Sequence, residues 1–277
     1  MGVARHALAL AFVALLSLGC AVAPGQEDEP EGTTTPRAEG RPEQLRFEPL
    51  RVLPHDATSF TQGLVWQDGV LYESVGQYGR SALIAWSPVT GEVEERTALP
   101  PSLFGEGLAV VGEELVQLTW RTGIALRWSL PPFRKLGEHR YTGEGWGLTT
   151  DPASGRLVMS DGTDRLLLRD PETFEVLDTL RVTDGAGQPV RFLNELEHAE
   201  GFIYANLWAT ETIVQIDPGT GVVTAEIDAS GLLDGVPVEG ADVLNGIAYH
   251  PESQTFWLTG KLWPLIFEGV FVEAGPQ

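Results

Sequence analysis

The sequence predicts an all-β fold, a five-bladed β-propeller, and three observations support this prediction. Short apolar runs separated by tight polar turns follow one another from Leu45 onward. No stretch after the first twenty residues shows a long helical period. A short frame also recurs five times, as FTQGL, FGEGL, GWGL, LNELE and LNGIA. Its aligned aliphatic residues are 44, 40, 48 and 51 residues apart, a period typical of propeller blades, and they are Leu64, Leu108, Leu148, Leu196 and Ile247.

Each repeat is expected to supply the strands of one blade. The frame opens a strand, a tight turn and a second strand, as in LVWQDGVLYES and LAVVGEELVQLTW. Turn residues such as those of DPASGR and HPESQT stand between the two strands. A third strand (IVQIDPGTG) and a fourth (VVTAEIDAS) follow, as in the fourth repeat. Five such repeats predict five blades.

The last repeat ends one strand short, and the segment RFEPLRVLP (Arg46 to Pro54) precedes the first repeat without a blade of its own. We expect this segment to be the outermost strand of the last blade. The first and last blades would then be joined, which leaves no open sheet edge.

The N-terminal region is expected to direct secretion. Residues 1–19 contain Arg5 and an apolar run from Ala7 to Leu18, as a signal peptide does. The run ends on Gly19-Cys20, so Cys20 is the predicted lipid attachment site of a lipoprotein; the alternative is an ordinary signal with an incidental cysteine. Residues 20–44 are rich in Pro, Glu, Gly and Thr and predict a disordered tether, and residues 45–277 are the predicted propeller domain. The protein would be periplasmic or on the cell surface, and lipid-anchored.

The charge limits the choice of partners. The chain has 18 Lys+Arg against 39 Asp+Glu, a net charge of -21. Nucleic acids and anionic membrane surfaces repel such a protein, so we expect neither as a partner and contact with the membrane only through the lipid anchor. Cys20 is the only cysteine, so no internal disulfide forms. We expect a monomer.

Two sets of unusual residues are expected to meet at one mouth of the channel between the blades. The frames contribute one set at equivalent positions: Gln62, Glu106, Trp146, Asn194 and Asn245. The ends of the second strands contribute Tyr78, Trp120, Asp161, Trp208 and Lys261. Since the start of one strand lies beside the end of the next in an antiparallel hairpin, both sets would line one pocket, the default position for a ligand site.

Several of these residues also have a structural interpretation. The three tryptophans could pack between blades, Asn194 and Asn245 could cap strands or turns, Asp161 is expected to be a turn residue, and Lys261 could be a solvated surface residue. Glu106 is the hardest to explain structurally. A carboxylate between glycines on an inner strand should be desolvated and have a raised pKa, as a general acid or base requires.

Nine motifs between about Phe60 and Pro264 resemble, in their order, those of the plant and bacterial glutaminyl-peptide cyclotransferases. These motifs are FTQGL, YESVGQYGRS, FGEGL, QLTW, EGWGLT, LNELE, IYANLWATETIVQIDPGTG, LNGIAY and TGKLWP. The resemblance implies a five-bladed propeller that converts the N-terminal glutamine of peptides or proteins to pyroglutamate and releases ammonia. It implies Glu106 as the catalytic glutamate and Lys261 and Asn194 as polar catalytic residues. It also implies Gln62, Trp120, Trp146 and Trp208 as substrate-binding residues.

Two other functions remain open at this point. Glu106, Asp161, Asn194 and Asn245 are oxygen ligands from different blades, so a metal-dependent lactonase or hydrolase is one alternative. A non-catalytic propeller that binds a partner at the channel mouth is the other. The cyclisation itself requires no metal or other cofactor, although a structural calcium ion is compatible with the fold.

Overall fold

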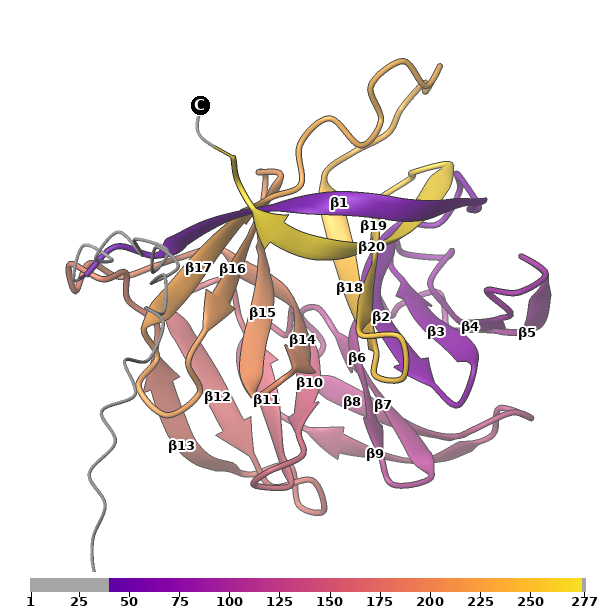
Figure 1. Cartoon of the computed structure of the whole chain (residues 1–277). Helices are drawn as coiled ribbons and strands as arrows, with labels where there is room; N and C mark the ends of the chain where they lie inside the picture. The colour runs from indigo at the N-terminus through magenta and orange to yellow at the C-terminus, as the bar shows by residue number, and fades with distance from the viewer. Residues whose placement is uncertain (1–39, 276–277) are drawn as a thin grey trace, which may run out of the picture. The chain divides into compact units, whose positions relative to one another are not determined.

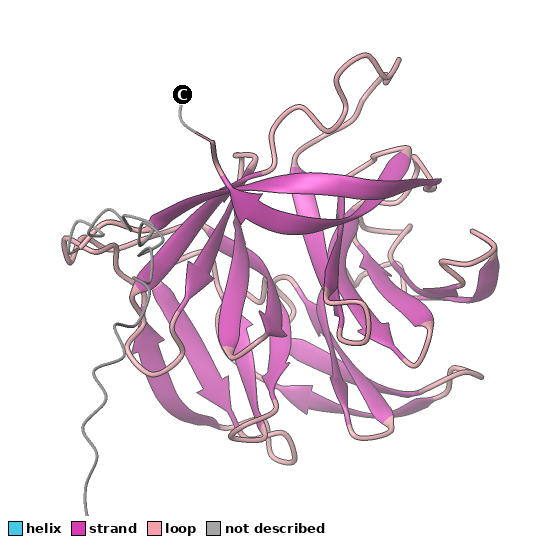
Figure 2. Cartoon of the chain, in the orientation of Figure 1, coloured by secondary structure: helices cyan, strands magenta, loops and turns pink. Residues whose placement is uncertain are grey.

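The computed structural model describes residues 40–275. The predicted signal peptide, Cys20 and the predicted tether up to residue 39 lie outside these residues. The described part is all-β, as predicted, and Figure 2 shows only strands and loops in it. Over residues 40–275, therefore, nothing resembles a membrane-spanning helix.

Three sheets contain four strands each, and every sheet follows chain order from its first to its fourth strand. The first contains β2 (Thr61–Gln67), β3 (Val70–Val75), β4 (Ala82–Trp86) and β5 (Val93–Ala98). The second contains β6 (Gly105–Val111), β7 (Glu114–Thr119), β8 (Ile124–Ser129) and β9 (Lys135–Arg140). The third contains β10 (Leu148–Asp151), β11 (Arg156–Ser160), β12 (Arg165–Arg169) and β13 (Val176–Arg181). All strand pairs in these sheets are antiparallel hairpins.

The remaining eight strands form one sheet in the order β14-β15-β16-β17-β1-β20-β19-β18. One half contains β14 (Leu193–Ala199), β15 (Phe202–Leu207), β16 (Thr212–Ile216) and β17 (Val223–Asp228). The other half contains β18 (Leu244–His250), β19 (Thr255–Gly260) and β20 (Leu265–Glu273). The N-terminal strand β1 (Glu43–Pro54) lies between the two halves.

Strand β1 pairs antiparallel with β20 from Leu45 to Pro54 and parallel with β17 from Glu43 to Arg46. Figure 1 shows the indigo β1 lying along the yellow β20. The strand begins at Glu43, two residues before the predicted domain start, because the backbone of β17 supplies hydrogen-bond partners there whatever the side chains are.

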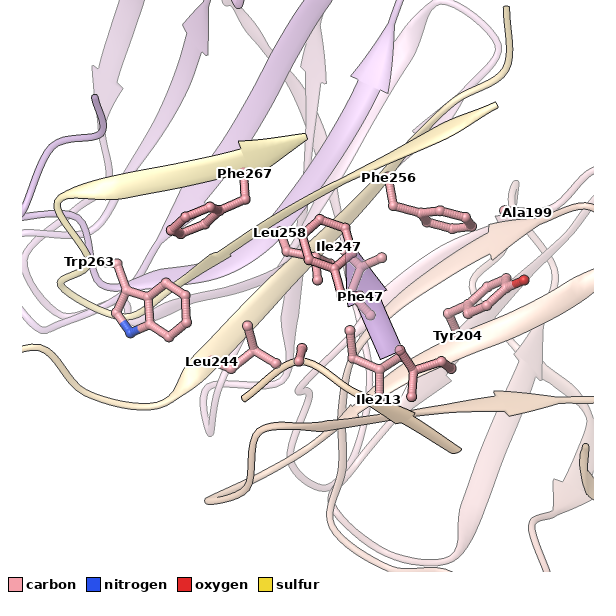
Figure 3. Close-up of a cluster of buried hydrophobic side chains, with 12 residues drawn as sticks. Phe47, Ala199, Tyr204, Ile213, Leu244, Ile247, Phe256, Leu258, Trp263 and Phe267 are labelled. Carbon is pink, nitrogen blue, oxygen red and sulfur yellow. The ribbon is translucent and has the colours of Figure 1, made fainter. Parts of the chain in front are cut away.

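The first strands of the five groups contact one another in a ring: β2 contacts β6, β6 contacts β10, β10 contacts β14, β14 contacts β18, and β18 contacts β2. The apolar core consists of five clusters of buried side chains, and each cluster is shared by two neighbouring groups of strands. Figure 3 shows one of them, in which Phe47 of β1 packs among side chains of β14–β16 and β18–β20.

The repeated frame opens each of these first strands, and we number its five positions from residues 60, 104, 144, 192 and 243. The strand register shifts at the frame in β2, β6, β14 and β18, which marks β-bulges. A bulge interrupts the regular alternation of side chains, so these frame residues do not simply alternate between the two faces of the sheet.

The fourth position is glycine in four of the five frames because the strands crowd there. A Cβ on Gly107 would lie 2.5 Å from the backbone nitrogen of Leu148, and one on Gly147 would lie 2.0 Å from the carbonyl oxygen of Asn194. Glycine at this position therefore allows the close approach of the inner strands.

Candidate active site

A cavity of about 430 Å³ opens where the frames begin and the second strands end. Among the described residues it contains all seven that the sequence predicts to be catalytic or substrate-binding. The residues that line it are Phe60, Gln62, Phe104, Glu106, Trp120, Arg121, Glu144, Trp146, Asn194, Trp208 and Lys261.

The strand order explains why these residues meet. The third frame position is at the start of a first strand or, for Trp146, two residues before it, and it holds Gln62, Glu106, Trp146 and Asn194. Trp120, Trp208 and Lys261 each follow directly on the end of a second strand, β7, β15 and β19. In an antiparallel hairpin these two places are neighbours, so the seven side chains are brought to one mouth of the ring.

Glu106 is 4 % exposed and lies between two glycines of β6. Its Oε1 accepts one hydrogen bond, from Nε2 of Gln62 at 3.0 Å. Burial raises the pKa of Glu106 well above its usual value, and the negative charge of Glu144 adds to this. The positive charge of Lys261 and the Gln62 hydrogen bond offset part of the rise. The raised pKa that the sequence predicts is therefore confirmed.

Lys261 is 5 % exposed, and burial lowers the pKa of its ammonium group, while the charges of Glu106 and Asp242 act against this. The backbone nitrogen of Lys261 donates to the carbonyl oxygen of Val243, and its carbonyl oxygen accepts from the backbone nitrogen of Asp242, at 2.9 Å each. Both partners lie just before β18. Its Nζ lies 5.1 Å from the ring centre of Phe60. Within residues 40–275, Lys261 has no carboxylate within 4.0 Å, so the group faces the cavity as a cation without a direct ion pair.

The orientation of the Gln62 amide is fixed by Asn245. Nδ2 of Asn245 donates to Oε1 of Gln62 at 3.2 Å and to the carbonyl oxygen of Thr61 at 2.9 Å. Because Oε1 of Gln62 is the acceptor, its Nε2 is directed at Glu106. Asn245 is fully buried and does not line the cavity, which agrees with its structural interpretation.

Aromatic rings form two walls of the cavity. Phe104 lies between Phe60 and Trp120, with ring centres 6.1 and 5.6 Å away. On the other side Trp146 packs edge-on against Trp208 at 5.9 Å. A ligand with a short apolar stretch and a polar end would lie between these walls with its polar end near the charged groups.

Sequence reasoning missed four lining residues: Phe60, Phe104, Arg121 and Glu144. Three of them share the first frame position, two residues before Gln62, Glu106 and Trp146, so the repeat itself contained the signal. The fourth, Arg121, follows Trp120, and its guanidinium lies 3.7 Å from the centre of the Trp120 ring.

Three residues of the predicted sets do not line the cavity. Tyr78 is 53 % exposed and packs against Phe104 at the rim. Asp161 binds the hydroxyl and backbone nitrogen of Thr163, as the expected turn residue. Of the four oxygen ligands proposed for a metal-dependent hydrolase, Glu106 and Asn194 line the cavity, whereas Asp161 and Asn245 do not. Within residues 40–275 no three His, Cys, Asp or Glu residues lie together in a way that could hold a metal ion.

The cavity thus combines a buried carboxylate, a buried ammonium, two side-chain amides and an aromatic lining. A carboxylate with a raised pKa can accept and return a proton near neutral pH. An ammonium and an amide can stabilise an oxygen that becomes negative during reaction. Acyl transfer from an amide needs both a proton carrier and a group that stabilises the negative oxygen.

Comparison with known proteins gives a consistent result. The glutamine cyclotransferase family model matches residues 14–271. A glutaminyl-peptide cyclotransferase from Arabidopsis thaliana is 37 % identical over 227 residues, which cover 80 % of this chain and 70 % of the relative. The crystal structure of Myxococcus xanthus glutaminyl cyclase superimposes with a TM-score of 0.78 and 39 % identity, over 84 % of this chain and all of the other.

Proposed function

This chain belongs to the glutamine cyclotransferase family, and from that premise we propose which of its residues carry out the reaction. It is an enzyme that cyclises the N-terminal glutaminyl residue of peptides to pyroglutamate and releases ammonia. The observation that supports the assignment of roles is the single cavity in which Glu106, Lys261 and Asn194 face the same aromatic walls.

In the proposed mechanism Glu106 is the general base and then the general acid. The substrate α-amine attacks the Cδ carbon of its own side-chain amide and transfers a proton to the Glu106 carboxylate. When the Cδ–Nε bond breaks, Glu106 returns that proton to the leaving nitrogen, which departs as ammonia. A peptide α-amine has a pKa of about 8, so a carboxyl group with a raised pKa is a better matched base than an ordinary one.

The other polar residues would stabilise and orient. Lys261 and Asn194 donate hydrogen bonds to the amide oxygen, which becomes negative as the amine attacks. Gln62 holds the Glu106 carboxylate through the 3.0 Å hydrogen bond. None of these steps needs a cofactor.

The tryptophans would bind the substrate side chain. Trp120, Trp146 and Trp208 hold it folded back on its own amine, so that the attack is intramolecular. By excluding water they also suppress the competing hydrolysis of the amide to glutamate.

The experiment uses the chain from residue 40 onward and a short peptide that begins with Gln, followed by mass spectrometry. The expected result is loss of one ammonia, unchanged by a chelator, with no reaction of the same peptide beginning with Asn. Glu106→Gln keeps the shape of the side chain but cannot take up the proton, so kcat should fall about a hundredfold to ten-thousandfold. Near wild-type turnover in Glu106→Gln would remove Glu106 from the mechanism.

We also propose that the sheets form five blades. In this reading the eight-stranded sheet is two blades joined edge to edge, β14–β17 and β18–β20 with β1, and β1 is the outermost strand of the last. Its antiparallel pairing with β20 and the ring of contacts between first strands support this. Deleting residues 43–54 should then lower the melting temperature far more than deleting residues 40–42.

We propose that residues 1–19 are removed, that Cys20 carries the lipid, and that residues 20–42, up to the start of β1, space a monomeric enzyme from the membrane, in the periplasm or at the cell surface. Labelled fatty acid should enter the protein made in a bacterial host and should not enter Cys20→Ser.

A further inference from the structure

Glu144 is a carboxylate of the cavity to which the mechanism above gives no role. It occupies the first frame position, where the other four frames have Phe60, Phe104, Phe192 and Val243. The third repeat therefore places a charge at the mouth where the other repeats place an apolar side chain. A charge at such a position needs partners that compensate its partial burial.

The partners of Glu144 are the cavity walls themselves. Its Oε2 accepts hydrogen bonds from the indole Nε1 of Trp120 at 2.8 Å and from that of Trp146 at 3.1 Å. Its Oε1 accepts from Nε of Arg121 at 2.9 Å. One carboxylate thus connects Trp120, directly after β7, with Trp146, just before β10 of the next sheet, and also binds Arg121, which covers the Trp120 ring.

We propose that Glu144 is a positioning residue for the cyclisation, and that it fixes the two indole rings against which the glutamine side chain folds. The inference rests on the proposed function of the cavity. Two indoles that donate to the same oxygen cannot rotate independently, because either rotation would leave a partly buried N–H without an acceptor. Hydrogen bonds to a charged acceptor are also stronger than neutral ones. The substrate then meets a preformed surface.

The charge of Glu144 has a second effect, on the catalytic carboxylate. Burial raises the pKa of Glu144, but the hydrogen bonds from Trp146, Arg121 and Trp120 outweigh this, so the pKa is lowered overall and the group stays ionised. Its negative charge raises the pKa of Glu106, which otherwise faces the opposing charge of Lys261 and the Gln62 amide. Removing the charge should therefore make Glu106 a weaker base.

Two variants separate these effects. Glu144→Gln keeps an oxygen that can accept from both indoles and removes the charge, whereas Glu144→Ala removes both. With a Gln peptide we expect KM to rise about tenfold or more in Glu144→Ala and to stay within about threefold of wild type in Glu144→Gln. In both variants the acid limb of kcat/KM should move to lower pH. Glu113→Ala, at the exposed turn between β6 and β7, is the matched control and should change neither.

The indole N–H resonances provide a readout that does not depend on turnover. Of the eight tryptophan signals, those of Trp120 and Trp146, assigned with Trp→Phe variants, should move in Glu144→Ala and largely return in Glu144→Gln. An active wild type with unchanged KM and unmoved indole signals in Glu144→Ala would overturn the proposal. An inactive wild type with moved signals would instead refute the function while leaving the indole contacts in place. A folded Glu144→Ala with equal loss in both variants would show that the charge matters and the indole bonds do not, which also overturns the positioning role.

Discussion

Two glutamates on inner strands, Glu106 and Glu195, are similarly buried but have different roles, one in the reaction and one in the fold. Glu106 is at the third position of its frame and Glu195 at the fourth position of its own. Both are buried, at 4 and 0 % exposure, and burial raises the pKa of both well above the usual value. Only Glu106 lines the cavity.

The difference lies in their partners. Glu195 stands where the other four frames have glycine, and its side chain crosses the ring interior. Its Oε1 accepts from the backbone nitrogen of Leu64 at 3.2 Å and its Oε2 from that of Ile247 at 2.8 Å. It therefore connects β14 to β2 and β18. Glu106 accepts one side-chain hydrogen bond and keeps its other oxygen free of any described partner, within residues 40–275.

This comparison shows that burial and a raised pKa do not by themselves identify a catalytic carboxylate. Structural carboxylates are perturbed for the same reason, desolvation. A catalytic group must also retain an oxygen that a substrate can reach. The predictions below follow from assigning Gly147 and Glu195, at the fourth frame position, to the stability of the fold and Glu106, at the third, to the reaction.

The largest effect is expected at Gly147, at a fourth position. In Gly147→Ala the added Cβ would meet the carbonyl oxygen of Asn194 at 2.0 Å, and that backbone cannot move without breaking the ring contact. The variant should lose about 3 kcal/mol of stability or more. Gly137→Ala is the control, since its Cβ finds nothing closer than 3.7 Å. Urea unfolding of both measures the difference, and equal stability would show that the strands do not crowd at the frame.

A smaller loss is expected at Glu195. In Glu195→Gln one oxygen becomes an NH₂ group that faces a backbone N–H, so one buried donor loses its acceptor. The cost should be about 2 kcal/mol, or about thirtyfold in the unfolding equilibrium. Glu106→Gln removes a buried carboxylate whose desolvation is costly. Its urea unfolding midpoint should therefore equal or exceed that of the wild type, although its turnover is lost. If Glu195→Gln were instead stable and inactive, the two roles would be reversed.

Much of this architecture follows from periodicity. The frame spacing predicts the strand pairs, and antiparallel pairing places Trp120, Trp208 and Lys261 beside the frames. Glu195 and Glu144 could not be interpreted in the same way. The sequence shows that each departs from the residue usual at its frame position, but the partner depends on the direction of the side chain. A bulge near Glu195 and the approach of Trp120 to Glu144 are settled only by three-dimensional packing.

The smallest effect is expected in the pH profile, and it comes from the positive charge that faces Glu106. Lys261 lowers the pKa of Glu106, so Lys261→Met should raise it. Glu106 acts as a base only when ionised, so the acid limb of kcat/KM should move to higher pH, by about one unit. This is opposite to the shift expected for Glu144→Gln, so the two variants should move the pKa of the same group, Glu106, in opposite directions. The maximal rate should also fall, since Lys261 is a proposed donor to the amide oxygen.

Lys135→Met is the matched control, because Lys135 lies on β9 and pairs with exposed Glu138. It should leave the limb unmoved. If Lys261→Met also left it unmoved, or shifted it the same way as Glu144→Gln, the limb would not report Glu106. Another group of the cavity would then have to be the base, and the contrast between a catalytic Glu106 and a structural Glu195 would no longer hold.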